Sequence, residues 1–215
     1  MSILFLLGTP KVSHKTSSCW FMAEAMSSGM TEKPVILSIA NDAPEVVADA
    51  IKNSSTILLI TPNYIHSVPA HVLDFLYKLV PDDGSRSFAV LIQSGFPEKH
   101  DSVYIKKYID RLIPQLGYAY NGCAVMGDAA SYGLVPDMCK KRIPLFAELG
   151  ARYEKTSALD EEYISSSGLS AYDVLPEKFE RKLNLMNKIG VGKMGWIFML
   201  RKNKAYKKRL DRPYL

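Results

Sequence analysis

Cysteine is scarce in this sequence, and its few copies stand far apart. The 215 residues contain only Cys19, Cys123 and Cys139, and no two of them form a CxxC pair. An odd number of widely spaced cysteines argues against a disulfide framework and fits reduced thiols in a cytoplasmic protein. Without a CxxC pair, zinc and iron–sulfur sites lack their usual ligand spacing, so we predict no metal site. No cysteine stands at a readable spacing from a histidine, which favours buried packing residues over nucleophiles.

Long apolar runs are missing as well. The first run, Ile3 to Leu7, has five residues, whereas a membrane-spanning helix needs about 20. No basic leader precedes this run and no small-residue cleavage pattern follows it, so we expect a buried strand and not a signal peptide. With 47% hydrophobic and 23% charged residues, the composition is that of a globular protein with a full core.

What the sequence does contain is an alternation of two patterns. Short, continuous apolar runs predict strands at 3–7, 34–39, 56–61 and 88–93, with a weaker fifth strand at 124–127. Apolar residues at helical spacing predict helices at roughly 16–28, 43–53, 68–79, 101–115 and 137–153. Continuous apolarity indicates strands covered on both faces, and the alternation with helices indicates parallel pairing. We therefore predict an α/β fold, a flavodoxin-like three-layer α/β/α sandwich whose five-stranded parallel sheet has the order 2-1-3-4-5.

Ligands of such sheets bind beyond the carboxyl ends of the strands, so residues 8–16, 61–69 and 93–98 are the segments to search. The first segment leaves its strand at Gly8 and brings several hydroxyl groups to the start of a helix. Free backbone N–H groups and the helix dipole favour an anion there. The segment matches neither the P-loop nor the GxGxxG pattern, which suits a single phosphate group. The alternative is that Thr16 or Ser17 only caps the helix, a role worth about 1 kcal/mol without any ligand.

A second segment, "TPNYIHSVPAHVLDFLYKL" at 61–79, supports the phosphate interpretation. Together the two segments resemble the flavodoxin-like NAD(P)H-dependent FMN reductases and related NAD(P)H oxidoreductases, whose loops read GSPRxxSxT and PxYxxxxPxxLKxFxD. The matching residues are Gly8, Thr9, Pro10, Lys11, Thr16, Pro62, Tyr64, Pro69, Leu73 and Phe75. The chain departs from the first pattern at Val12 and His14, and Lys11 replaces an arginine, which removes a bidentate contact to phosphate.

The resemblance implies a bound FMN, with its phosphate in the 8–17 loop and its isoalloxazine ring between loops 62–67 and 94–97, and NAD(P)H as cosubstrate. The cofactor-binding residues that it implies are Thr9, Lys11, Ser13, Thr16, Ser17, Pro62, Asn63, Tyr64, Ile65, Ser94, Gly95 and Phe96. Physical chemistry agrees with this placement, because Pro62 frees the following amides, Gly95 permits close approach, and Tyr64 and Phe96 offer aromatic faces. We expect no catalytic acid or base, since hydride transfer to flavin needs none from the protein.

Other polar residues have more than one interpretation. His66 lies in the second loop and is interpreted as a solvated or capping residue, with donation to a substrate or to the flavin as the alternative. His71 and His100 are predicted at the surface. Asp128 and the "ASYG" segment at 130–133 either rim the pocket or form an ordinary turn.

The expected function is that of an FMN-dependent oxidoreductase, which accepts hydride from NAD(P)H and passes electrons to a small molecule such as a quinone, an azo or nitro compound, or another flavin. A flavodoxin-like electron carrier or flavin-binding module without NAD(P)H activity is the alternative, although long-chain flavodoxins tend to be acidic and this sequence has a pI of about 9.0. A flavodoxin-fold scaffold that has lost its cofactor is a third interpretation. The acceptor, the choice between NADH and NADPH, and the oligomeric state, a homodimer included, stay open.

The C-terminal part differs in charge from the rest. Residues 176–215 carry 12 Lys and Arg against three Asp and Glu, a net charge of +9, whereas the preceding residues have a net charge of −4. We predict an FMN-binding domain at 1–155, and a polar connection with a basic helical extension at 156–215. A helix is expected from Pro176 or Glu177, interrupted by Gly190, Gly192 and Gly195.

The apolar cluster of Met194 and Trp196 to Leu200, next to this charge, has two interpretations. It docks on the domain, or it makes peripheral contact with an anionic membrane surface. Nucleic acid is not an expected partner, because the aromatic residues are not interleaved with the basic ones as a stacking platform requires.

Overall fold

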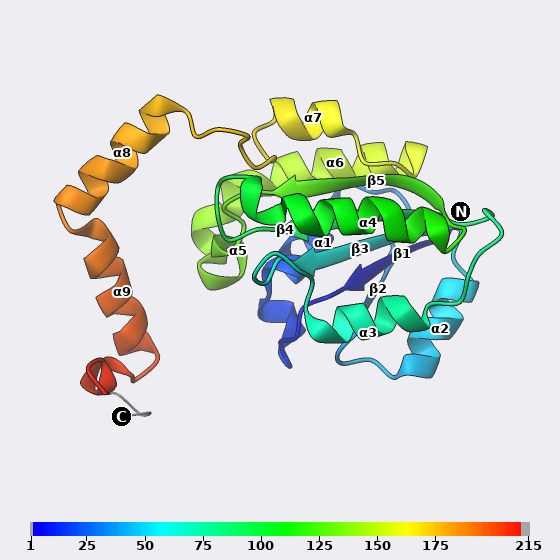
Figure 1. Ribbon diagram of the computed structural model, residues 1–215, viewed down its shortest axis with the longest axis horizontal. Helices are drawn as coiled ribbons and strands as arrows, with labels where there is room; N and C mark the ends of the chain where they lie inside the picture. The colour runs from blue at the N-terminus through cyan, green and yellow to red at the C-terminus, as the bar shows by residue number, and fades with distance from the viewer. Residues whose placement is uncertain (1, 212–215) are drawn as a thin grey trace. The chain divides into compact units, whose positions relative to one another are not determined.

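The computed structural model describes residues 2–211 of the chain (Figure 1). Its residues form two compact units, Met1–Asp173 and Val174–Leu215. The first unit contains a parallel sheet with helices on both faces, and the second unit contains helices alone.

The sheet of the first unit has five parallel strands in the order β2-β1-β3-β4-β5, which confirms the predicted topology. The strands are β1 (Ile3–Leu7), β2 (Val35–Ser38), β3 (Thr56–Pro62), β4 (Ser87–Gln93) and β5 (Ala119–Met126). Pairing of Leu7 with Ile60, and of Pro62 with Gln93, aligns the carboxyl ends of the three central strands at one edge. The loops that follow these strands therefore meet at that edge.

Helices cover both faces of this sheet. They are α1 (Ser18–Ser28), α2 (Pro44–Lys52), α3 (Ala70–Lys78), α4 (Val103–Gln115), α5 (Ser131–Leu134), α6 (Ile143–Thr156) and α7 (Glu161–Ser166), with 3₁₀ turns at His14–Thr16, His100–Ser102 and Pro136–Arg142. Helices α1 and α6 pack on one face, and α2, α3 and α4 pack on the other. The three-layer α/β/α sandwich expected from the alternating pattern is confirmed.

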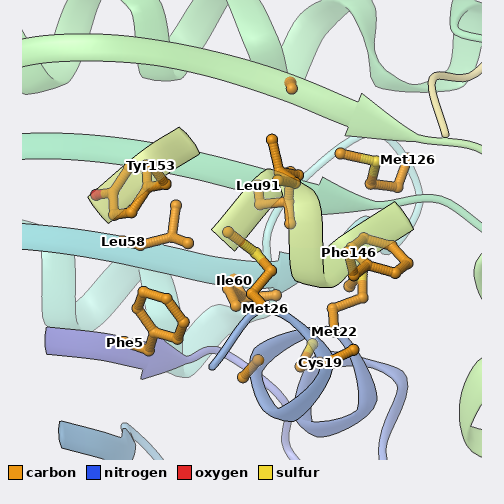
Figure 2. Close-up of a cluster of buried hydrophobic side chains, with 14 of the residues drawn as sticks. Phe5, Cys19, Met22, Met26, Leu58, Ile60, Leu91, Met126, Phe146 and Tyr153 are labelled. Carbon is orange, nitrogen blue, oxygen red and sulfur yellow. The ribbon is translucent and has the colours of Figure 1, made fainter. Parts of the chain in front are cut away.

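Side-chain alternation along the buried strands divides the core into two layers. Figure 2 shows the layer on the α1 and α6 face, where Phe5, Leu58 and Ile60 lie against Met26 and Tyr153. The neighbouring strand residues, such as Leu4 and Leu59, point to the opposite layer under α2, α3 and α4. Because both faces are covered, every residue of β1 and β3 is buried, which explains the continuous apolar runs.

The fifth strand is longer than its weak sequence signal suggests. It begins at Ala119, five residues before the apolar run at 124, and its pairing with β4 shifts register between Phe88 and Val90. Gly122 has a φ of 101° at this irregularity, a conformation that favours glycine. A local bulge changes which side chains face the core, so the apolar pattern of this strand is interrupted.

The first unit extends beyond the predicted boundary at residue 155. Residues 157–173 contain α7, and they bury Leu159, Ile164, Leu169 and Ala171 in the two core layers. The backbone of Ala171 also donates to the carbonyl of Val125 in β5 (2.9 Å). This serine-rich segment packs on the sheet because its few apolar residues are spaced to reach the core, whereas its overall polarity suggested a connection.

The second unit consists of α8 (Glu177–Lys188), α9 (Val191–Lys202) and a 3₁₀ turn at Tyr206–Lys208. Gly190 separates the two helices with a φ of 77°, as the predicted interruption requires. The interruption predicted at Gly192 and Gly195 is wrong, because α9 continues through both; glycine inside a helix costs only about 1 kcal/mol relative to alanine. Within residues 2–211, no helix combines the length and the apolarity needed to cross a membrane.

Candidate functional site

The loops after β3, β4 and β5 are joined to one another by backbone hydrogen bonds at the carboxyl edge of the sheet. The N–H of Asn63 donates to the carbonyl of Gln93 (2.8 Å), and the N–H of Ser94 donates to Met126 (2.9 Å). Ala129 in turn donates to the carbonyl of Ser94 (2.9 Å). The structure therefore brings the predicted 62–67 and 94–97 loops together, and it adds the loop after β5 to them.

The first loop leaves the sheet at Gly8, where the surroundings leave no room for a side chain. A Cβ atom at Gly8 would lie 2.7 Å from Thr61 Oγ1 and 2.9 Å from a methyl group of Val72. Thr9 is buried next to it, and its Oγ1 accepts from the N–H of Lys11 (3.4 Å). From Thr9 the chain runs out over the edge of the sheet toward the start of α1.

The hydroxyl groups of this loop make local hydrogen bonds. Ser17 is the N-cap of α1, since its Oγ accepts from the N–H of Trp20 (3.1 Å) and donates to the carbonyl of His14 (2.5 Å). Thr16 is exposed, and its Oγ1 donates to the carbonyl of Ser13 (2.8 Å). The capping alternative thus describes Ser17 in this structure. To donate to a phosphate group, each of these hydroxyl groups would first have to give up its hydrogen bond to the carbonyl of Ser13 or His14.

The electrostatic surroundings of the first loop favour an anion. Residues 1–23 include Lys11 and Lys15 but no Asp or Glu. The ammonium group of Lys11 donates to the carbonyl oxygen of Thr16 (3.2 Å), one residue before the N-cap of α1. The first N–H groups of α1 have no acceptor within the helix, and the helix dipole adds partial positive charge at the same end. Lysine, amide and hydroxyl donors therefore converge on this end of the helix.

The two departures from the family pattern do not fill this loop. Val12 is exposed. The ring of His14 lies beside Trp20, with 5.5 Å between the ring centroids, and Lys15 lies 5.4 Å from the Trp20 centroid on the same indole. Both departures are accommodated at the protein surface.

The second loop contains backbone strain. Tyr64 and Ser67 are joined by two hydrogen bonds (2.7 and 3.2 Å) across a two-residue turn, in which Ile65 and His66 have φ values of 50° and 64°. Positive φ at both central residues defines a type I′ turn, which normally selects glycine or asparagine. A β-branched residue there is strained by about 1–3 kcal/mol, and Ile65 gains no burial in return because it is 93% exposed. Strain of this kind is concentrated at ligand-binding loops.

The third loop, residues 94–102 between β4 and α4, accepts hydrogen bonds that hold this turn in place. The amide Nδ2 of Asn63 donates to the carbonyl of Asp101 and to Ser102 Oγ (both 3.0 Å), and His66 Nδ1 lies 2.9 Å from the same Asp101 carbonyl. The other amide atom, Asn63 Oδ1, is buried and has no hydrogen-bond partner among the described residues. It is an acceptor at the loop junction that a ligand donor could satisfy.

The aromatic residues predicted to flank a ring, Tyr64 and Phe96, are both exposed. Partial burial raises the pKa of the Tyr64 phenol, so this hydroxyl stays protonated at neutral pH. At Gly95 the nearest atom to an added Cβ would be the Ala130 methyl carbon at 3.7 Å. No internal contact therefore requires glycine at this position, and Gly95 is exposed.

Two contacts at the start of α1 were missed by the sequence reasoning. Ser18 Oγ accepts from the N–H of Gly133 (3.0 Å) and donates to the carbonyl of Ala130 (3.3 Å), which docks α5 on α1. A Cβ at Gly133 would lie 2.7 Å from the backbone nitrogen of Ser18. The "ASYG" segment at 130–133 was noted in the sequence, but no local pattern predicts its contact with Ser18, 115 residues away.

Asp128 lies in the turn at 127–130 that follows β5. Its φ is 55°, and its N–H donates to the carbonyl of Phe96 (3.0 Å). Burial raises the pKa of the Asp128 carboxyl group, and Arg142 opposes this shift. Of the two interpretations left open for Asp128, the structure shows the turn, and the hydrogen bond to Phe96 joins this turn to the loop after β4.

The other histidines lie outside the junction of the loops or at its border. His100 is exposed, with Nε2 3.1 Å from Asp101 Oδ1. His71 was predicted at the surface but is half-buried, because α3 turns it toward the sheet; its Nε2 is buried, and burial lowers its pKa. His71 lines a cavity of about 440 Å³ between α2 and α3, which is separate from the four loops. Among the described residues no three His, Cys, Asp or Glu side chains group as metal ligands.

The three cysteines are buried free thiols. Burial raises the pKa of Cys19 and of Cys123 to about 12, so roughly one thiol in ten thousand is ionised at pH 8. We expect iodoacetamide at pH 8 to leave both cysteines unmodified in the native protein and to alkylate both after unfolding, as mass spectrometry of tryptic peptides would show. Rapid alkylation of Cys19 in the folded chain would contradict its burial beside the first loop.

The donor set fits a phosphorylated, flat ligand such as FMN. The first loop offers donors for one phosphate group and contains no second glycine-rich turn for a pyrophosphate. Between the second and third loops, exposed aromatic rings, an accessible backbone at Gly95 and the unpaired Asn63 Oδ1 suit a polar aromatic ring system. The donors for a phosphate group thus lie in the first loop, and the features that suit a ring lie in the second and third loops.

The fold is shared with several solved structures. The flavodiiron core Flv1 of Synechocystis sp. PCC6803 aligns with a TM-score of 0.53 at 12% identity, over 73% of this chain and 36% of that one. General stress protein 14 of Treponema denticola, solved with FMN, aligns with a TM-score of 0.53 at 9% identity, over 73% and 99%. An NAD(P)H:quinone oxidoreductase of Methanothermobacter marburgensis aligns with a TM-score of 0.53 at 14% identity, over 72% and 94%.

These likenesses establish the flavodoxin-like fold, which the sequence resemblance implied. This chain spans about a third of the length of the flavodiiron core. No family model matches the sequence, and no curated protein matches it. At identities of 9–14%, the similarity is one of architecture.

Proposed function

We propose that this chain binds one FMN and acts as an oxidoreductase that takes electrons from NAD(P)H and delivers them to a small-molecule acceptor. The observation that carries this proposal is the loop cluster at the carboxyl edge of the sheet, where an acid-free, donor-rich loop adjoins two loops with exposed aromatic rings. Two structural neighbours support it by analogy, since one was solved with FMN and another is an NAD(P)H:quinone oxidoreductase.

In this proposal the residues of the chain bind and orient. Lys11, Thr16, Ser17 and the first N–H groups of α1 would hold the phosphate group, while Thr9 and Ser13 shape the loop that presents them. Asn63, Tyr64, Ile65, Ser94, Gly95 and Phe96 would surround the ring, and Pro62 ends β3 where these amides become free. The strained Ile65–His66 turn positions the backbone before the ligand arrives.

When bound, FMN would supply hydride acceptance at N5 and electron transfer to the acceptor. The protein would contribute backbone amides near the ring edge that becomes negatively charged on reduction. No side-chain acid or base is required for hydride transfer, which is consistent with loops that present amides and hydroxyl groups. The buried thiols fit a reducing compartment such as the cytoplasm.

Anaerobic mixing with pyridine nucleotide is the direct test. The purified chain reconstituted with FMN should carry one flavin and should lose its flavin absorbance within seconds after NADPH or NADH is added. The physical reason is that the exposed Tyr64 and Phe96 leave the ring site accessible for nucleotide stacking. Absorbance spectra, recorded with each nucleotide and then with dithionite, measure the result.

The other outcomes separate the alternatives. Flavin that is reduced by dithionite but by neither nucleotide would contradict an NAD(P)H oxidoreductase and leave an electron carrier. A preparation that is colourless and ignores added FMN would contradict cofactor binding altogether and leave a scaffold. Preference for FAD over FMN would contradict the single-phosphate site.

A further inference from the structure

Helix α9 of the second unit is apolar on all sides, yet none of its residues is buried. Between Val191 and Leu200 the only charged side chain is Lys193. Met194, Trp196 and Phe198 are 67%, 66% and 61% exposed, and at about 100° per residue Trp196 and Phe198 point to opposite sides of the helix. A helix that is hydrophobic all round normally lies in a protein core or in lipid. Helix α9 therefore requires an apolar partner surface, either protein or lipid.

Positive charge surrounds this apolar helix. Residues 181–210 contain ten Lys and Arg and no Asp or Glu. In the described part of the second unit, Arg181 alone forms a salt bridge, with Glu177 (2.7 Å). The basic cluster begins in the last turn of α9 and continues beyond it; it comprises Arg201, Lys202, Lys204, Lys207, Lys208 and Arg209.

One aromatic ring organises the basic cluster. The guanidinium carbons of Arg201 and Arg209 lie 5.1 Å and 4.3 Å from the ring centroid of Tyr206. Stacking on an aromatic ring orders these two cations without neutralising them. The charge of the cluster thus remains available to an anionic partner.

We propose that the second unit binds the surface of an anionic lipid bilayer, with α9 at the boundary between head groups and acyl chains and the basic cluster against the lipid phosphates. Pairing of two copies through α9 would bring together two units of net charge +9, which repel each other. Nucleic acid would neutralise the cations but leave α9 in water. An anionic lipid surface satisfies both the apolar helix and the charge.

The dimensions of α9 fit an interfacial position. Its 12 residues extend about 18 Å, whereas the hydrocarbon core of a bilayer is about 30 Å thick. A helix of this length lies in the interface, where Trp and Phe side chains are favoured. This proposal does not depend on flavin binding.

Sedimentation of the full chain with vesicles tests the proposal. We expect binding to equal mixtures of phosphatidylglycerol and phosphatidylcholine in about 0.01 M salt, where charges interact over about 30 Å, and release in about 1 M salt, where the range is about 3 Å. Vesicles of phosphatidylcholine alone should bind far less. Tryptophan emission should shift to shorter wavelength as Trp196 leaves water.

Matched variants separate charge from apolarity. Lys207→Gln/Lys208→Gln/Arg209→Gln should weaken binding about fivefold per cation, on the order of a hundredfold in all. Lys140→Gln/Lys141→Gln/Lys155→Gln, three exposed lysines of the first unit, make the same change in net charge and should have little effect. Trp196→Ser/Phe198→Ser should weaken binding at least tenfold, whereas Trp196→Phe should still bind but lose the emission shift.

Several results would overturn the proposal. One is a full chain that ignores anionic vesicles at low salt. Another is an equal loss of binding in the two lysine and arginine triples, which would reveal attraction by net charge alone. Sedimentation equilibrium that shows a dimer abolished by Trp196→Ser/Phe198→Ser, without vesicle binding, would identify a second copy as the cover. Tighter binding to duplex DNA than to vesicles would identify nucleic acid.

Discussion

A chain carrying Thr16→Ala and Ser17→Ala should bind FMN on the order of a hundredfold more weakly than the natural sequence. Each charge-assisted hydrogen bond to phosphate is worth about 1.5–3 kcal/mol. The lower end applies here, because both hydroxyl groups must first give up their bonds to the carbonyls of Ser13 and His14. Fluorescence quenching during FMN titration would measure the dissociation constant.

The chain offers a matched control for this double variant. Ser28 lies at the other end of α1, and its Oγ donates to the carbonyl of Ala25 (2.7 Å), the same local bond that Thr16 makes. Ser28→Ala should leave FMN affinity unchanged. Because Ser17→Ala also removes the N-cap of α1, at a cost of about 1 kcal/mol in stability, Thr16→Ala alone provides a variant without that complication. Unchanged affinity in the double variant would show that this loop does not hold the phosphate.

Gly150→Ala should destabilise the first unit by about 3 kcal/mol. Helices α1 and α6 cross so closely that a Cβ at Gly150 would overlap the carbonyl group of Met26, and a Cβ at Gly29 would overlap that of Ala147. Both obstacles are backbone atoms, so no side chain can rotate away and the helices must separate. Overpacking of this kind costs typically 1–3 kcal/mol, and backbone contact places this site at the upper end. Urea unfolding followed by circular dichroism would measure the loss.

Gly195→Ala is the matched control, because it makes the same substitution inside a helix. An added Cβ at Gly195 has no neighbour within 4 Å. Alanine should therefore gain up to about 1 kcal/mol of helix propensity in α9 and leave the unfolding of the first unit unchanged. A Gly150→Ala chain as stable as the natural one would mean that α1 and α6 do not approach each other this closely.

Much of the fold can be predicted from local sequence patterns, and the elements that were predicted poorly have local causes. The runs around Leu4 and Leu59 predicted strands because both faces of those strands are buried, which leaves a continuous apolar signal. The sequence signal for the fifth strand was weak because the register shift in its pairing with β4 interrupts the apolar run. The segment at 157–173 was assigned as a connection because four buried side chains are too few to outweigh its serines.

In the candidate site, too, some features could be predicted from the sequence and others could not. Gly8, Pro62 and Gly95 could be placed at strand ends because a parallel sheet brings all its carboxyl ends to one edge. Whether Thr16 and Ser17 bind a phosphate group stays a prediction, and so do the contacts proposed around the ring. What the structure adds is that Ser17 caps α1 and that the turn at Ile65 and His66 is strained.

The sequence by itself determined the layers, the strand order and the loops that meet, because each follows from periodicity and chain direction along short segments. Only the tertiary structure decided which distant groups touch. Gly133 lies against Ser18, and Asn63 lies against Ser102, across separations that no local pattern encodes. Such contacts depend on how helices settle on the sheet to within an ångström, and that is decided by close packing of the whole core.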